Sequence, residues 1–253
     1  MLRTRVMPCL LIKGGGLIKT CNFKKYRYVG DPINAVRIFN QKEVDELIIF
    51  DIDASKNKII QYDLIEQITS ECFMPLCYGG GVKNIEDFRK LFYIGVEKVS
   101  ISSLIFENPS VVRTAIEIFG AQSIIATFDI KKGFFCNKYY AYIYSGKKNT
   151  KIKIDECLKL AKKIGVGEII LNSIDRDGTW NGFDLNLFKS IKEEVDVPIV
   201  AVGGAGSLED IKEIVITGGA TAVGIGSMTV FQSKGMGVLI KFPTQKELST
   251  LFD

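Results

Sequence analysis

Three segments of the chain recur in the same order later in the sequence. Each copy pairs a short apolar run with the polar or glycine-rich residues that follow it. An ordered repeat of this length indicates a fold made of two equivalent structural units. The matching pairs are residues 43–53 (EVDELIIFDID) with 165–175 (GVGEIILNSID), 75–87 (PLCYGGGVKNIED) with 198–210 (PIVAVGGAGSLED), and 95–103 (GVEKVSISS) with 219–227 (GATAVGIGS).

Short apolar runs alternate with amphipathic or looped segments along the chain, which predicts alternating strands and helices. Eight strands close a parallel barrel, and 253 residues suit one such domain. We therefore predict an α/β fold, a single (β/α)8 TIM barrel over residues 1–253, with half-barrels of about residues 1–120 and 121–240. The predicted strands are RVMPCLLI (5–12), ELIIFDID (46–53), MPLCYGG (74–80), KVSISS (98–103), SIIATFDI (123–130), EIILNSID (168–175), PIVAVGG (198–204) and AVGIGS (222–227).

Composition narrows the class of protein. The 33 basic and 29 acidic residues are spread along the chain, so no nucleic-acid groove is expected. No segment has about 20 uninterrupted apolar residues, so we expect no membrane span and a cytoplasmic protein. The chain has no histidine, and its cysteines lack metal-ligand spacing, so neither a metal nor another cofactor is expected. The cysteines, which we expect to be reduced thiols in the core, are Cys9, Cys21, Cys72, Cys77, Cys136 and Cys157.

Glycines and small polar residues follow equivalent strands in the two copies of the repeat. In a parallel barrel the carboxyl ends of the strands meet at one opening, which we call the mouth. Glycine there lets backbone N–H groups approach an anion, although glycines also serve simply to make tight turns. The repeat favours two phosphate cradles and hence a phosphate-bearing small molecule. The cradle residues are Gly80, Gly81, Ser102 and Ser103 in the first half, and Gly203, Gly204, Gly226 and Ser227 in the second.

The two halves differ in the residue that ends their first strand. Aligning residues 6–15 (VMPCLLIKGG) with 124–133 (IIATFDIKKG) places Leu11 over Asp129. A two-fold mouth could use one carboxyl group as general acid and the other as general base, but leucine can do neither. The remaining proton-transfer candidates at the mouth are its lysines and Asp51, Asp53, Asp129, Asp175 and Asp177.

A family resemblance rests on DELIIFDIDAS, YGGGVKNIEDF, KVSISS, YSGKKNT, SIDRDGTWNGFD and VGGAG. These segments resemble the cyclase subunit of imidazole glycerol phosphate synthase, the HisF-like family of ammonia-using barrels in histidine biosynthesis. The resemblance runs from residue 1 to about residue 231 and implies catalytic aspartates at the positions of Asp129 and Leu11. It also implies a mobile loop after the first strand that carries a substrate-contacting Lys19. Further substrate contacts are expected from Ser145 of YSGKKNT and from Asp177 and Gly178 of SIDRDGT.

The same resemblance implies a partner. In that family a HisH-like glutaminase releases ammonia at the amino-terminal face of the barrel, where four charged residues form a salt-bridge gate. The corresponding residues are Arg5, Glu46, Lys98 and Glu168. A purely stabilising plug is the alternative, because inward charges in a barrel must pair with one another.

The C-terminal segment GSMTVFQSKGMGVLIKFPT (226–244) resembles a divergent branch of the family found in surface-polysaccharide loci. In that branch a barrel and a glutaminase supply ammonia to an N-acetyl sugar amidotransferase. We therefore predict a subunit of a glutamine amidotransferase system that passes ammonia on for sugar amidation and, with Leu11, has given up cyclisation. Two alternatives stay open: an active cyclase, or lyase, of histidine biosynthesis, in which Asp51 replaces the missing acid, and a non-catalytic interaction scaffold.

Overall fold

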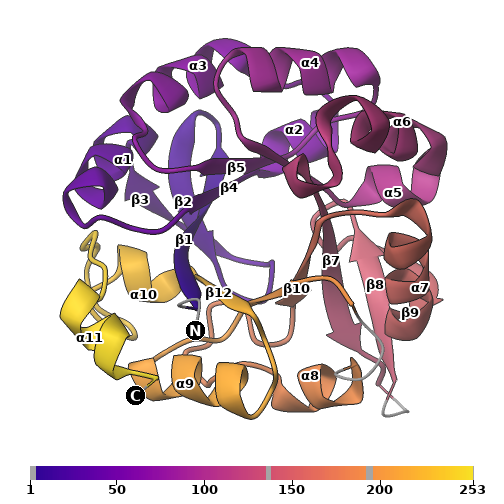
Figure 1. The fold of residues 1–253 in the computed structure, drawn as a ribbon. Helices are drawn as coiled ribbons and strands as arrows, with labels where there is room; N and C mark the ends of the chain where they lie inside the picture. Colours follow the sequence, from indigo (N-terminus) through magenta and orange to yellow (C-terminus); the bar gives the residue numbers. More distant parts are fainter. Residues whose placement is uncertain (1–3, 135–137, 192–195, 253) are drawn as a thin grey trace.

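The computed structural model describes residues 4–134, 138–191 and 196–252. Eight parallel strands close into a barrel, because the last of them pairs with the first. The predicted (β/α)8 fold is therefore confirmed, and every predicted strand is present (Figure 1). In order around the barrel the strands are β1 (Arg5–Lys13), β4 (Leu47–Asp51), β5 (Leu76–Gly79), β6 (Lys98–Ile101), β7 (Ile124–Lys132), β10 (Glu168–Ser173), β11 (Ile199–Val202) and β12 (Ala222–Ile225).

Amphipathic helices form a ring outside the strands and bury their apolar faces against them (Figure 1). The helix α4 begins at a capping box made by Asn84 and Asp87, and α9 begins at another made by Ser207 and Asp210. The helices are α1 (Pro32–Gln41), α2 (Ile52–Asn57), α3 (Tyr62–Glu71), α4 (Ile85–Tyr93), α5 (Ser103–Glu107), α6 (Pro109–Phe119), α7 (Ile154–Ile164), α8 (Leu185–Ile191), α9 (Leu208–Ile216), α10 (Ser227–Val230) and α11 (Gln245–Thr250), with a 3-10 turn at Ala121–Ser123. Among the described residues, none of these helices is long and apolar enough to cross a membrane.

The residues that the structure describes form two separate apolar cores. The larger lies between the strands and the helices, and the smaller fills the inside of the barrel, which we call the lumen. Successive residues of a strand point to opposite faces, so alternate residues supply the two cores. The lumen core consists of Met7, Cys9, Ile48, Cys77, Ile125, Ile170, Val200, Val202 and Ala222, with Phe50 packed against it.

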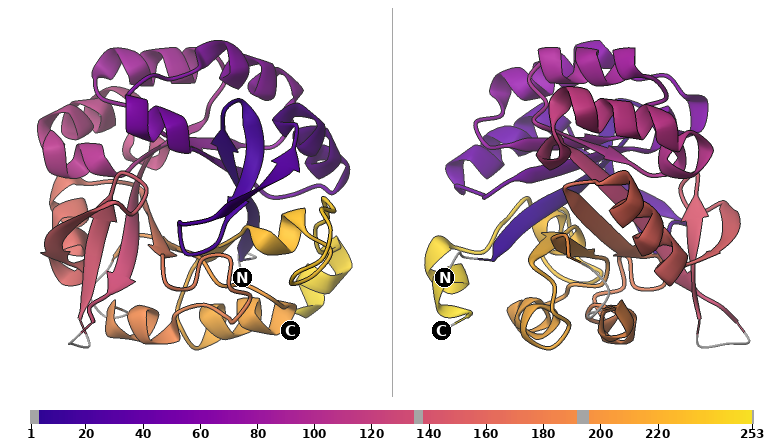
Figure 2. Two further views of the ribbon diagram at one scale, coloured as in Figure 1. Left: turned by 180° about the vertical axis from the view of Figure 1, so that it is seen from behind. Right: turned by 45° about the vertical axis from the view of Figure 1, so that its right-hand side comes forward.

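Each half of the chain adds an antiparallel ribbon beyond the mouth end of its first strand. The first is β1 with β2 (Gly16–Thr20) and β3 (Tyr26–Gly30), and the second is β7 with β8 (Tyr139–Ile143) and β9 (Lys148–Lys153). The two ribbons lie on opposite sides of the barrel axis (Figure 2). The prediction of a loop after β1 is thus wrong in part, because Gly14 and Gly15, with φ of 58° and 78°, make a tight hairpin turn.

The C-terminal segment leaves the mouth rim and ends near the other face of the barrel. An isolated bridge joins Phe231 to Val238, and Nη1 of Arg27 on β3 donates to the Met236 carbonyl oxygen at 2.8 Å. Further along, Nε2 of Gln245 donates to the carbonyl oxygen of Glu43, which precedes β4. Residues 231–239 therefore lie beside the mouth ribbon of the first half.

The prediction that the cysteines are core thiols holds for some of them. Cys9, Cys77 and Cys157 are buried, but Cys21 is exposed at the turn between β2 and β3. Cys72 is partly buried, and Cys136 lies outside the described residues.

Candidate functional site

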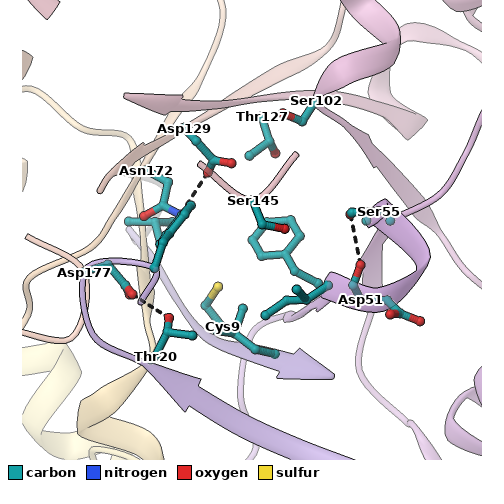
Figure 3. Close-up of a pocket in the computed structure, with 18 of the residues that line it drawn as sticks. Cys9, Thr20, Asp51, Ser55, Ser102, Thr127, Asp129, Ser145, Asn172 and Asp177 are labelled. Carbon is teal, nitrogen blue, oxygen red and sulfur yellow. Dashed lines mark hydrogen bonds between the residues drawn. The ribbon is translucent and has the colours of Figure 1, made fainter. Parts of the chain in front are cut away.

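The predicted mouth residues line one cavity of about 320 Å³ at the carboxyl ends of the barrel strands (Figure 3). Both halves of the barrel contribute to it. Its lining includes Lys19, Gly80, Gly81, Ser102, Ser103, Asp129, Ser145, Asp177, Gly178, Gly203, Gly204, Gly226 and Ser227, and also Leu11 and Asp51.

Asp129 is the acid of the second half. It lies on β7 beside Asn172 of β10, whose Nδ2 donates to Oδ1 of Asp129 at 3.2 Å. Burial raises the pKa of Asp129 to about 7, although the hydrogen bond from Asn172 opposes the shift. A carboxyl group with this pKa can take or release a proton near neutral pH.

Leu11 occupies the corresponding place in the first half. It lies in register with Phe50 of the neighbouring β4, and both side chains line the cavity. The first half thus presents a leucine and a phenylalanine where the second presents an acid and an amide. No proton can be exchanged at this pair.

Asp51 lies across the cavity from Asp129 (Figure 3). Its side chain caps α2, since Oδ1 accepts the backbone N–H of Ala54 at 2.9 Å. Burial raises the pKa of Asp51, while the backbone N–H of Ala54 and the nearby hydroxyl of Tyr78 oppose this shift. The cap gives Asp51 a structural role whether or not it also exchanges protons.

Asp53 and Asp175 do not line the cavity, although both were candidates for proton transfer. Oδ2 of Asp53 accepts the backbone N–H of Gly14 at 2.8 Å, and Oδ2 of Asp175 accepts that of Lys132 at 2.9 Å. Each carboxylate therefore anchors the chain where it leaves the first strand of its half.

Lys19 is buried at the mouth rather than extended from a loop. Its Nζ lies 2.6 Å from Oδ1 of Asp177, and the hydroxyl of Thr20 donates to Oδ2 of the same carboxylate at 2.8 Å. A Cβ at Gly178 would lie 2.3 Å from the Thr20 carbonyl oxygen, so only glycine permits this approach. The ribbon of the first half is thereby tied to the loop after β10.

The two cradles hold their polar groups differently. In the first half Oγ of Ser102 is buried without a hydrogen-bond partner, and Nζ of Lys58 donates to Oγ of Ser103 at 3.3 Å. In the second half the lysine nearest Gly226 is Lys19, whose charge is already paired with Asp177. Lys58 is itself paired with Glu107 at 3.2 Å, so the group that the first cradle leaves without a partner is the hydroxyl of Ser102.

Four charged side chains close the opposite end of the lumen, and we call them the basal ionic cluster. Arg5 donates to Glu46 at 2.5 Å and also to Glu168, while Nζ of Lys98 lies 2.6 Å from Glu46 and 3.3 Å from Glu168. Both glutamates are about 95% buried, with exposed fractions of 3% and 5%. The cluster contains two cations and two anions, so its charges balance, and the predicted gate residues lie together as expected.

Large apolar side chains are exposed around the same end. Phe73 precedes β5 and is 85% exposed, and Tyr93 is the last residue of α4 and is 90% exposed. Ile118 and Ile216, near the ends of α6 and α9, are also exposed. Single exposed apolar residues are common on protein surfaces, and these four share the end of the barrel that carries the basal ionic cluster.

Asn172 and Phe50 line the cavity but were not among the predicted site residues. The repeat aligns them, since EIILNSID and ELIIFDID are equivalent strands. That alignment could have identified both residues as part of the site, because a polar side chain in the second half replaces an apolar one in the first, as with Asp129 and Leu11.

Comparison with known proteins defines the class. Residues 5–234 match the family described as "Histidine biosynthesis protein". A protein of Leptospira interrogans, provisionally named as imidazole glycerol phosphate synthase subunit HisF, is 45% identical over 253 residues and all of both chains. A similarly named subunit from Pseudomonas aeruginosa is 47% identical over 249 residues, covering 98% of this chain and 99% of its own. The chain belongs to the histidine biosynthesis protein family and is HisF-like.

More distant relatives carry the HisF name without qualification. The imidazole glycerol phosphate synthase subunit HisF of Methanococcus vannielii is 36% identical, over 90% of this chain and 91% of its own. The predicted HisF-like resemblance is therefore confirmed. None of these names refers to sugar amidation.

Proposed function

We propose that this chain is the barrel subunit of a glutamine amidotransferase. Ammonia from a HisH-like glutaminase enters at the basal ionic cluster, follows the lumen and reaches the cavity at the mouth. The observation that carries this proposal is the closed cluster of Arg5, Glu46, Lys98 and Glu168 at one end of a lumen whose other end is a cavity lined by Asp129.

The energetics of the cluster support a gate over a plug. Buried ion pairs are often no more stabilising than apolar side chains of similar volume, and an apolar layer is what usually fills a barrel. A small set of paired charges can instead open when a partner supplies other contacts. Exposed Phe73 and Tyr93 at the same end offer the surface on which a glutaminase would dock.

For the fate of the ammonia, we propose transfer to an acceptor outside this chain. Leu11 with Phe50 removes one of the two proton-transfer positions, which is expected to slow cyclisation severely. The acceptor that the C-terminal resemblance suggests is an N-acetyl sugar bound by a sugar amidotransferase in surface glycan biosynthesis. Residues 231–239 lie at the mouth rim, where such a partner would receive the ammonia.

The second candidate is the cyclase reaction of imidazole glycerol phosphate synthase itself. The names of the relatives described above favour it directly, and none of those names refers to sugar amidation. Asp129 has a pKa suited to acid–base work, and Asp51 lies across the same cavity. In this alternative Asp51 performs the role that Leu11 cannot.

One experiment separates the two. The purified chain is mixed with an active HisH-type glutaminase and glutamine, and both glutamine hydrolysis and consumption of the phosphoribosyl imidazolecarboxamide substrate are followed. Stimulated hydrolysis without consumption supports an external acceptor, whereas consumption at an ordinary enzymatic rate supports the cyclase.

Two controls make the result decisive. Phe73→Asp is expected to weaken stimulation because it places a charge on the proposed docking face, while Glu86→Ala, an exposed residue in the first turn of α4 at the mouth end of the barrel, is expected to leave it unchanged. Absence of stimulation by the unmodified chain would overturn ammonia transfer and leave a binding scaffold.

A further inference from the structure

The side-chain carbonyl oxygen of Asn172 is buried in the cavity and has no hydrogen-bond partner. The residue is only 7% exposed. Leaving a buried acceptor unpaired is unfavourable, because the group loses its hydrogen bonds to water, so native proteins rarely do so without a ligand or water. This oxygen is therefore a candidate ligand contact.

The orientation of the amide is set by Asp129. Nδ2 of Asn172 donates to Oδ1 of that carboxyl group at 3.2 Å, and a carboxylate accepts but does not donate hydrogen bonds. When Asp129 is ionised, reversing the amide would bring two acceptor oxygens together. The hydrogen bond therefore keeps Oδ1 of Asn172 turned away from Asp129.

Gly203 keeps this oxygen uncovered. A Cβ at position 203 would lie 3.0 Å from Oδ1 of Asn172 and 2.8 Å from the Ser173 carbonyl oxygen. The φ of Gly203 is also positive, at 96°. The glycine thus permits both the turn after β11 and the space in front of the amide oxygen.

The lumen below Asn172 is apolar. Ile170, two residues earlier on β10, points into the lumen core with Ile125 and Val200. The hydroxyls of Ser100 and Thr127 also line the cavity, but they are paired with each other at 2.5 Å. A small polar molecule that leaves the apolar layer therefore meets an acceptor on Asn172 that no protein group satisfies.

The first half of the barrel has no equivalent acceptor, because Phe50 stands at the corresponding position. Its ring lies over Gly79, where an added Cβ would come within 2.8 Å of Cδ1 of Phe50. One side of the mouth is closed by an aromatic ring, and the other carries the unpaired oxygen.

We propose that Oδ1 of Asn172 accepts an N–H from ammonia as it leaves the lumen and holds it beside Asp129. This proposal rests on the proposed function for the source of the ammonia. The recognised chemistry is a small nitrogen that carries N–H donors, which a substrate amide entering from the mouth would share. The apolar lumen below and the neighbouring carboxylate favour ammonia as this ligand.

The test is a titration of the 15N-labelled chain followed by NMR, using ammonium chloride as the probe at about pH 8, where Asp129 is ionised. Sodium and potassium chloride at equal ionic strength control for a monovalent cation, and acetamide represents a substrate amide. We expect saturable shifts of the Asn172 side-chain amide and the Gly203 backbone amide with ammonium.

Three variants sharpen the reading. Asn172→Leu removes the acceptor at similar volume and is expected to weaken ammonium binding at least about tenfold, measured at Gly203. Gly203→Ala places a methyl group against the same oxygen and should weaken it several-fold, measured at the Asn172 amide. Asn149→Leu, which removes an exposed amide bonded to the Tyr142 hydroxyl outside the cavity, should leave binding unchanged.

The proposal is overturned if Asn172→Leu binds ammonium as well as the unmodified chain, or if potassium gives the same saturable shifts. Stronger response to acetamide than to ammonium would also overturn it, in favour of a substrate amide. Thermal unfolding of Asn172→Leu provides a check, since a lower melting temperature would indicate a purely structural amide. Ammonium binding needs no glutaminase, so its outcome is independent of the stimulation experiment.

Discussion

The two halves of the barrel share their supporting hydrogen bonds but differ at the mouth. Asp53 and Asp175 each accept a backbone N–H at the end of the first strand of their half, from Gly14 at 2.8 Å and from Lys132 at 2.9 Å. The capping boxes that start α4 and α9 are likewise equivalent. At the mouth, however, the first half has Leu11 and Phe50 at the positions that Asp129 and Asn172 occupy in the second half.

This comparison shows that the requirements for forming the barrel are independent of the residues that line its mouth. Backbone anchors and helix caps are needed to form the barrel in either half, whatever the mouth does. The residues that end the strands can change without disturbing those bonds, because their side chains point into the cavity. Chemistry at the mouth therefore diverges between the halves while the scaffold remains the same.

The largest expected effect comes from restoring an acid in the first half. If the rest of the cyclase machinery is intact, Leu11→Asp should raise turnover of the phosphoribosyl imidazolecarboxamide substrate by roughly 10² to 10⁴-fold, as expected for a restored acid–base group. Leu11→Asn, similar in size but unable to exchange a proton, is the matched control. Equal rates for both variants would show that position 11 is not what separates the halves.

Asp129 should make stability depend on pH. Its pKa in the folded state, about 7, lies above the unfolded value near 4, so the folded chain binds this proton more tightly. The free energy of unfolding should then fall by up to about 4 kcal/mol as pH rises between those values. Asp129→Asn should flatten this part of a urea-denaturation profile, whereas Leu11→Asn should leave its slope unchanged.

The basal ionic cluster should respond equally to changes in either half. Glu46→Gln and Glu168→Gln each leave Arg5 and Lys98 sharing one carboxylate in a buried site. Each should lower the free energy of unfolding by about 3 kcal/mol, because an unbalanced buried charge remains. Unequal losses in urea denaturation would show that one half contributes more to the cluster.

The smallest effect concerns the helix caps. Asn84→Ala and Ser207→Ala each remove a side chain that accepts the N–H of the third residue of its helix. Each should lower the free energy of unfolding by about 1 kcal/mol. A difference between them beyond measurement error in thermal unfolding would contradict the equivalence of the two halves.

The barrel was predictable because the sequence patterns that indicate it are local and occur twice. Alternating apolar runs fixed the strands, and the repeat showed which strands correspond. The ribbon β2–β3 was missed because its glycines and lysines are also typical of loops, and only the pairing between its strands distinguishes the two. The division into two half-barrels remains a prediction.

The sequence predicted which residues line the cavity, but not which of them contact one another. Strand ends identified Asp129 and Asp177, since residues at the carboxyl ends must share the mouth, whereas Lys19 was expected from the family resemblance. The pairing of Lys19 with Asp177 brings together residues far apart in the chain, so spacing could not reveal it. The unpaired oxygen of Asn172 depends on Gly203, in the turn after β11, and could not be predicted from spacing either.

The apolar core of the lumen gives the barrel a selectivity of its own. Between the basal ionic cluster and the mouth, a permeating molecule must pass among Met7, Ile48, Cys77 and the aliphatic side chains around them. An ion would lose its hydration there without compensation, whereas a neutral molecule loses far less. Ammonia that crosses the barrel as proposed should therefore do so as the un-ionised gas and not as ammonium, so that permeation rises with pH as the neutral fraction grows.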